Sequence, residues 1–157
     1  MRFAYKRYEI PRSPLDGSTE IHRPEIVVHL IGEAGEIYCS GLVDTGADSV
    51  VIGQTIARQI GVKLQPKHRW PVHGFSGHTL EAVLGHVEVE IVSRTESFCW
   101  QLPVAVVTYP DLASEEIVVL GQSGFLEYFD VRFLGDAHVV ELKPNASFPK
   151  KRRRKLA

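Results

Sequence analysis

The sequence predicts a mainly β domain, either a closed barrel or a sandwich, and three observations support this fold class. Short apolar segments alternate with turn residues along most of the chain, and some show the two-residue period of a half-buried strand. Segments with a helical period are few and short. A length of 157 residues, with 44% hydrophobic and 24% charged residues, fits one folded domain.

Six segments have the composition or alternation of strands, and a turn containing two glycines at 32–35 joins the first two as a hairpin. Pro103 breaks the fourth segment and favours an edge or a bulge there. The six predicted strands are residues 25–31, 36–43, 83–92, 100–107, 131–134 and 138–142.

Two short helices are predicted, at 53–60 before Gly61 and at 122–129. These elements define a domain over residues 25–143. Residues 1–24, rich in proline and charge, are expected to form an N-terminal arm with one possible strand within residues 2–10. Residues 144–157 are expected to form a basic, disordered tail.

Overall charge and cysteine usage exclude several classes of protein. The formal net charge of -1 argues against a chain that binds nucleic acid over its whole surface, although the basic run at 150–155 could bind it or act as a nuclear localisation signal. A solvated terminus is the simpler reading of that run.

Cys39 and Cys99 lie far apart without a C-x-x-C unit, which favours reduced, partly buried thiols. Neither a signal peptide nor a membrane-length apolar run is seen, so a cytoplasmic location is expected.

The strongest functional signal is the segment Leu42-Val43-Asp44-Thr45-Gly46-Ala47-Asp48-Ser49. An apolar run ends on an acid, a hydroxyl and a glycine, and apolar residues resume at Val50. This pattern places Asp44 on a sharp loop between buried segments. A carboxylate held in such a place is costly unless a partner or a reaction uses it. A turn aspartate bonded to its own backbone is the alternative.

This segment resembles the active-site motif of retropepsin-like aspartic proteases. Two further features follow in that family's order. Residues 70–77 (Trp-Pro-Val-His-Gly-Phe-Ser-Gly) resemble the tip of the flap hairpin, and residues 117–126 resemble the apolar-apolar-Gly segment and short helix that brace the active-site loop. The resemblance covers roughly residues 25–143 and implies a closed β-barrel protomer with one or two short helices. An ordinary glycine-rich hairpin is the alternative for the flap, and a core position is favoured for Trp70.

The resemblance also implies a role for each site residue. Asp44 would be catalytic. The remaining roles are support of the active-site loop by Thr45, Gly46 and Ala47, substrate binding by Asp48, Gly74, Phe75, Ser76 and Gly77, and bracing of the loop by Gly121. No metal and no cofactor is expected, because two carboxylates can activate water and protonate the substrate by themselves.

Asp-Thr-Gly occurs once in the chain, so a pair of catalytic carboxylates requires two chains related by a two-fold axis. The predicted function is therefore that of a homodimeric aspartic endopeptidase, a hydrolase acting on a peptide or protein substrate. A retropepsin-fold module that dimerises or binds peptides without cleaving them is the alternative.

Two other enzyme classes fit poorly. Gly121-Gln122-Ser123-Gly124-Phe125 approaches a serine-hydrolase nucleophile elbow, but phenylalanine stands where the last glycine belongs. His68, His73 and His78 have no acidic partner at a metal-binding spacing.

Overall fold

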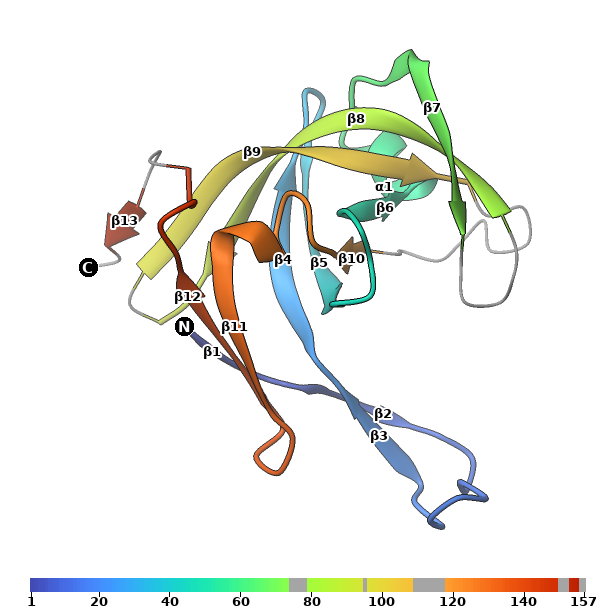
Figure 1. Cartoon of the computed structure of the whole chain (residues 1–157), viewed down its shortest axis with the longest axis vertical. Helices are drawn as coiled ribbons and strands as arrows, with labels where there is room; N and C mark the ends of the chain where they lie inside the picture. Colours follow the sequence, from blue (N-terminus) through green and yellow to red (C-terminus); the bar gives the residue numbers. More distant parts are fainter. Residues whose placement is uncertain (74–78, 95, 109–117, 150–152, 156–157) are drawn as a thin grey trace.

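The computed structural model describes every residue except 74–78, 95, 109–117, 150–152 and 156–157 (Figure 1). The described part consists mainly of strands. In chain order the elements are β1 (Arg2–Ala4), β2 (Lys6–Glu9), β3 (Glu20–Arg23), β4 (Glu25–Ile31), β5 (Glu36–Val43), β6 (Val51–Gly53), α1 (Gln54–Gln59), β7 (Gln65–His73), β8 (Thr79–Val92), β9 (Glu96–Val107), β10 (Val118–Leu120), the 3-10 helix η1 (Leu126–Tyr128), β11 (Phe129–Leu134), β12 (Val139–Pro144) and β13 (Arg153–Lys155).

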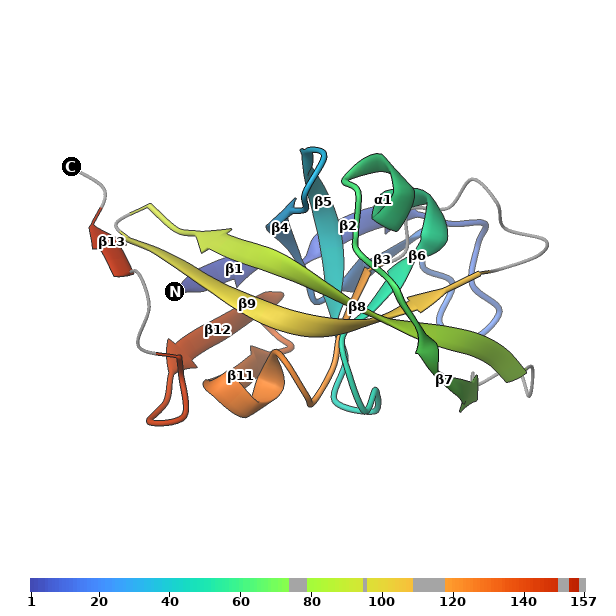
Figure 2. The same cartoon turned by 90° about the horizontal axis from the view of Figure 1, so that it is seen from above.

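Six strands close into a barrel. They pair in the order β9, β6, β10, β5, β4 and β8, and β8 pairs again with β9. Two pairs of neighbouring strands are parallel, β5 with β10 and β6 with β9, and the other pairs of the ring are antiparallel. The long strands β8 and β9 lie side by side across the molecule in both views (Figures 1 and 2). The prediction of a mainly β fold built on a closed barrel is confirmed.

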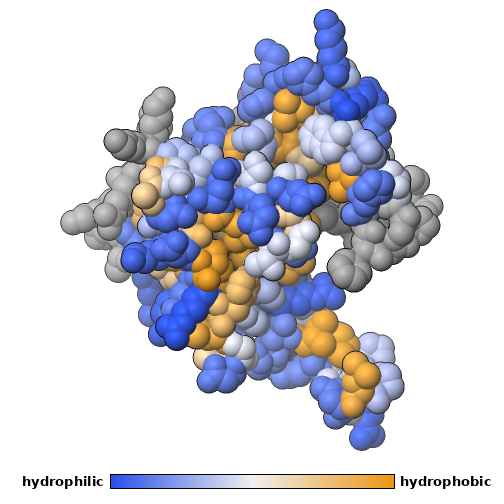
Figure 3. Space-filling model, in the orientation of Figure 1, coloured by the Kyte–Doolittle hydropathy of each residue, from blue (hydrophilic) through white to orange (hydrophobic). Residues whose placement is uncertain are grey.

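The barrel encloses a continuous apolar core, to which alternate residues of β4 and β8 contribute Ile26, Val28, Val87 and Val89, all at most 2% exposed. This alternation is the expected result of a strand with one face turned inward. On the face seen in Figure 3, hydrophilic residues cover much of the surface and apolar residues are visible between them.

The observed elements follow the sequence closely where local signals are strong. β4 and β5 have the predicted bounds, and the amide of Gly32 donates to the carbonyl of Gly35 at 2.9 Å in the turn between them. Helix α1 lies inside the predicted 53–60 and ends before Gly61, whose φ of 70° suits glycine. Pro103 lies in β9 and pairs with His86 of β8, in a ladder that has no bulge. On its other side, the pairing of β9 with β6 begins only at Ala105.

The helix predicted at 122–129 is wrong in extent. Only Leu126–Tyr128 form a single 3-10 turn, and Phe129 already begins β11. Gly124 has a φ of 92° and Phe125 has a φ of -131°, neither of which fits an α-helix. Phe125 and Phe129 are nevertheless buried, at 0% and 3% exposure, so both rings reach the core without an α-helix.

Residues before β4 contain more strand than the sequence suggested. β1 pairs with β12 in a separate three-stranded sheet with β11. β2 and β3 pair only with each other and form a hairpin that projects away from the barrel (Figure 1). β3 lies outside residues 2–10, the part of the N-terminal arm in which one strand is expected.

The segment after β12 begins with an ordered turn rather than a loose tail. The amide of Asn145 donates to the carbonyl of Tyr128 at 3.0 Å, and the amide of Phe148 donates to the carbonyl of Asn145 at 3.2 Å. The Phe148 ring packs edge-on against Trp100 at 5.3 Å and Phe98 at 5.4 Å between ring centroids. Within the described residues, no helix is long and apolar enough to cross a membrane.

Candidate active site

Asp44 is the first residue after β5, and its backbone is tied to the neighbouring strand. The parallel ladder between β5 and β10 pairs Val43 with Leu120, and the next amide, that of Asp44, donates to the Leu120 carbonyl at 3.2 Å. Val43 is buried in the core, at 3% exposure, whereas Asp44 is half-buried. The barrel therefore fixes the point at which the acid leaves the sheet.

The loop turns sharply around the Asp44 carboxylate. Gly46 donates its amide to Oδ1 of Asp44 at 2.8 Å, and Ala47 donates its amide to the Asp44 carbonyl at 3.3 Å. A Cβ at Gly46 would lie 3.3 Å from Oδ1, so the absence of a side chain lets this amide approach the carboxylate closely.

The segment after β10 forms the floor of this loop. Gln122 and Ser123 donate their amides to the carbonyls of Ala47 and Asp48 at 2.8 and 2.9 Å. The Gln122 side chain adds a second contact, because its Nε2 donates to the Thr45 carbonyl at 2.9 Å. The sequence reasoning missed Gln122. Its place directly after Gly121 in the bracing segment was the one available signal.

Gly121 lies where a side chain could not fit. A Cβ built on it would lie 2.3 Å from the carbonyl oxygen of Ser49 and 2.6 Å from that of Ala47. Both neighbours are backbone atoms of the active-site loop, so they could move only if the loop moved. Two segments that are more than 70 residues apart in the sequence are thus in direct backbone contact at this point.

The structure places the predicted site residues unevenly. Asp44, Thr45, Gly46, Ala47 and Asp48 share one loop, in which Thr45 and Asp48 are exposed and Ala47 is half-buried. Gly121 lies directly beneath them. The predicted flap residues Gly74, Phe75, Ser76 and Gly77 lie outside the described residues.

The strands on both sides of the predicted flap tip are described. β7 and β8 pair antiparallel, and their last pair before the tip is His73 with Thr79, whose side chains lie 3.1 Å apart at Nδ1 and Oγ1. Trp70 of β7 is half-buried against Ala82 and Ala105, in a small apolar cluster. It packs at the edge of this cluster and not in its buried part, so the core position favoured by the sequence is reached only in part.

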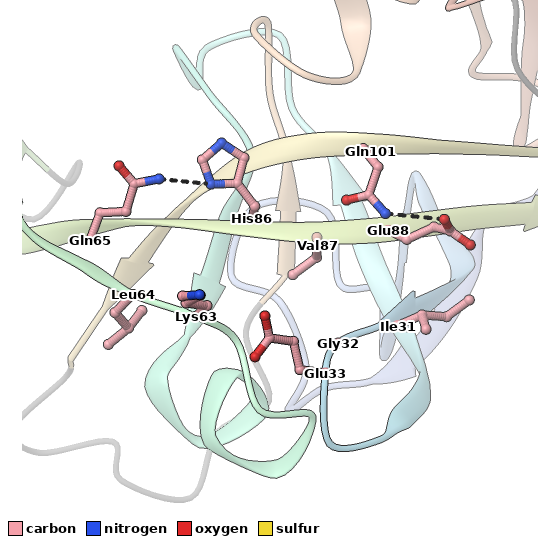
Figure 4. Close-up of a pocket in the computed structure, with 10 residues that line it drawn as sticks. All are labelled: Ile31, Gly32, Glu33, Lys63, Leu64, Gln65, His86, Val87, Glu88 and Gln101. Atoms are coloured by element: carbon pink, nitrogen blue, oxygen red, sulfur yellow. Dashed lines mark hydrogen bonds between the residues drawn. The ribbon is translucent and has the colours of Figure 1, made fainter.

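A groove of about 580 Å³ lies elsewhere on the barrel (Figure 4). It borders Gly32, at the end of β4 opposite to Glu25, whereas Glu25 pairs with Leu42 close to Asp44. Its wall carries two side-chain pairs, Gln65 Nε2 with His86 Nδ1 at 3.3 Å and Gln101 Nε2 with Glu88 at 3.1 Å. The groove is therefore separate from the candidate active site.

Comparison with known proteins identifies the family to which the chain belongs. The family model described as "Aspartyl protease" matches residues 32–123, a range that contains both the Asp44 loop and Gly121 and covers more than half of the chain. The chain belongs to the aspartyl protease family, and the family prediction is confirmed. Membership supports a protease-type function. No curated protein is significantly similar to the chain.

Two solved structures are similar to this one. A retropepsin-like aspartic protease from Rickettsia conorii is 16% identical with a TM-score of 0.45, over 89% of this chain and 97% of that chain. EIAV protease in complex with the inhibitor HBY-793 is 19% identical with a TM-score of 0.39, over 69% of this chain and 86% of that chain. Both TM-scores are below 0.5, so the family assignment depends on the family model.

Proposed function

We propose that this protein is an aspartic endopeptidase that works as a homodimer, with one Asp44 from each chain. The observation that carries the proposal is the placement of the chain's single Asp-Thr-Gly. It follows a core strand directly, the amide of Asp44 is bonded to β10, Gly121 lies against the carbonyls of Ala47 and Ser49 in the same loop, and Asp44 remains half-buried rather than enclosed.

The chemistry requires two such carboxylates close together. Like charges in contact cannot both ionise easily, so the pair shares one proton and titrates as a unit. The ionised member removes a proton from water, whose oxygen attacks the carbonyl carbon of the peptide bond. The protonated member donates its proton to the carbonyl oxygen. Collapse of the tetrahedral intermediate breaks the C–N bond: the carboxyl group that took the proton of water passes it to the leaving nitrogen, and the other carboxylate recovers the proton that it had donated.

The loop suits this task because its backbone leaves little freedom. Gly46 directs an amide at Oδ1 of Asp44, and the floor formed by Gln122 and Ser123 holds the two residues that follow. A carboxylate placed in advance avoids the cost of reorganisation during the reaction. Thr45, Ala47 and Asp48 complete the proposed loop, and the predicted flap at 74–77 would cover an extended substrate.

Asp44→Asn tests this function directly. Asparagine keeps a carbonyl oxygen that can accept from Gly46 but cannot take the proton of water. Cleavage of a peptide library between pH 3 and pH 8 should fall by roughly 10³-fold or more. Thermal unfolding followed by circular dichroism should show that the fold survives.

Asp136→Asn is the matched control, since Asp136 is an exposed turn residue on the β11–β12 hairpin. It should cleave as the wild type does. Full cleavage by pure Asp44→Asn protein would end the proposal. A wild type that binds library peptides but cleaves none at any pH would instead identify the non-proteolytic module.

A further inference from the structure

The hairpin of β2 and β3 leaves the barrel next to the candidate active site. Pro24, the residue after β3, accepts a hydrogen bond at its carbonyl from the amide of Val43 at 2.9 Å. Val43 immediately precedes Asp44. The hairpin is therefore attached at the end of the barrel that carries the Asp44 loop, and it projects from there (Figure 1).

The base of the hairpin is anchored to the body of the protein. Glu25 of β4 accepts from the Tyr8 hydroxyl at 2.6 Å and the Ser40 hydroxyl at 2.8 Å, and its carboxylate lies 3.7 Å from Lys6 Nζ. On the other side, His22 stacks on His138 of the β11–β12 turn, with ring centroids 3.9 Å apart. These contacts fix the direction in which the hairpin points.

The tip of the hairpin, residues 10–19, is ordered by its own contacts. The amide of Ile10 donates to the carbonyl of Thr19 at 2.9 Å, and that of Ser13 donates to the carbonyl of Ser18 at 2.8 Å. Asp16 accepts from the amide of Ser18 at 3.0 Å, and this hydrogen bond lowers the pKa of its carboxyl group. The tip thus holds a defined shape at a distance from the barrel.

At this tip one large apolar side chain is exposed to solvent. Leu15 is 95% exposed, the highest value among the exposed large hydrophobic residues, and apolar side chains are visible on the projecting hairpin (Figure 3). A two-stranded hairpin is only marginally stable alone in water. A hairpin that is anchored at its base and exposes a leucine at its tip is suited to bind a partner through that tip.

We infer that the tip packs on a second copy of this chain. The inference rests on the proposed function, because the dimer that joins two Asp44 loops must form at the end of the barrel where the hairpin is attached. There, the two hairpins would be related by the two-fold axis, and each would extend over the partner's barrel. The hairpin is continuous with the Asp44 face at its base, and contact of its tip with the partner would enlarge the area that each chain buries. A specific interface needs roughly 1,000 Å² or more in total.

Two variants of the tip test the inference, each made in an Asp44→Asn background to prevent self-cleavage. In the first, Leu15→Asp places a charge at the tip. In the second, residues 10–19 are replaced by Asn-Gly, a two-residue turn that can close the hairpin directly from Glu9 to Glu20, which are already paired. Sedimentation equilibrium should show a dimer dissociation constant about tenfold weaker for Leu15→Asp and weaker still for the replacement.

Leu64→Asp is the matched control. Leu64 is also an exposed leucine, at 37%, but it lies beside the groove near Gly32, away from the Asp44 end of the barrel. Its dimer dissociation constant should equal that of the parent. Circular dichroism should show equal melting temperatures for the protomers of Leu15→Asp and Leu64→Asp.

The outcomes separate this inference from the proposed function. A dimer whose dissociation constant is unchanged by both tip variants overturns the inference and leaves the dimeric protease intact. The same holds if, with Asp44 restored, Leu15→Asp alters only KM, since the tip would then contact substrate. A wild type that cleaves as a monomer overturns the proposed dimeric function itself.

Discussion

At the scale of single residues, the candidate site is held mainly by backbone atoms. The amides of Asp44, Gly46, Ala47, Gln122 and Ser123 each find an acceptor within the loop or its floor, at 2.8 to 3.3 Å. The sequence identified Asp44 because an acid after a buried strand is unusual and because its neighbours resemble a known motif. For Gln122 the one indication was its place directly after Gly121, since no local pattern shows that its side chain reaches the carbonyl of Thr45.

Gly121→Ala should damage the loop from below. The added Cβ would meet the carbonyl oxygens of Ser49 and Ala47 at 2.3 and 2.6 Å, so the loop must shift. We expect the free energy of unfolding to fall by about 1–3 kcal/mol, the usual cost of overpacking. Peptidase activity should fall further than stability alone explains, because Asp44 moves with the loop. Urea unfolding and kcat/KM measure the two effects.

Gly135→Ala provides the comparison, because no heavy atom lies within 4 Å of a Cβ built there. Its stability should remain within about 0.5 kcal/mol of the wild type. Equal behaviour of the two alanine variants would show that the close contact at Gly121 is not important.

At the scale of elements, local signals determined strands and loops better than they determined the region around residues 122–129. In β4, β5 and α1 the pattern of apolar residues fits the element, and turn residues or glycines mark where each element ends. The stretch from Gln122 combines helical spacing with Gly124, and the positive φ of that glycine leads the chain into a 3-10 turn and then into β11. Packing decides between an α-helix and this 3-10 turn, since Phe125 and Phe129 can both be buried without an α-helix.

The turn after β12 should contribute measurably to stability. Phe148 lies against four aromatic rings, those of Phe98, Trp100, Tyr128 and Phe129, at centroid distances of 5.3 to 6.2 Å. Phe148→Ala should lower the free energy of unfolding by about 1–3 kcal/mol, less than for a fully buried ring because Phe148 is half-buried. Chemical denaturation measures this.

Phe133→Ala is the control for that change. Phe133 lies on β11 and is 40% exposed. Its replacement by alanine should lower the free energy of unfolding by no more than about 0.5 kcal/mol. If Phe148→Ala were equally neutral, the turn would have to be a loose tail, as the basic composition of residues 144–157 suggested.

At the scale of the whole molecule, closure of the barrel brings together the segments that form the candidate site. β10, a three-residue strand near residue 120, fits between β5 and β6 and completes the ring. This brings Gly121 under the Asp44 loop. The ring supplies one Asp-Thr-Gly and thus half of the proposed catalytic pair.

Subunit mixing measures whether the other half comes from a second chain. Wild-type and Asp44→Asn proteins, mixed in equal amounts and allowed to exchange, should retain about one quarter of the activity of an all-wild-type sample, because only one dimer in four has both acids. Independent monomers would retain about one half. A result of one half would contradict the shared site, and measurement before exchange provides the control.

The sequence by itself determined the β class, the strand β5 that leads into the Asp44 loop and the position of the candidate acid, because each depends on residue type and local period. It did not predict the short strands β6 and β10. The tertiary structure decided which segments meet: that residue 121 passes within contact of residue 47, that Gln122 reaches Thr45, and that β2 and β3 form a projecting hairpin beside Asp44. The physical reason is that pairing between strands distant in sequence depends on closure of the whole barrel, and no local pattern records that closure.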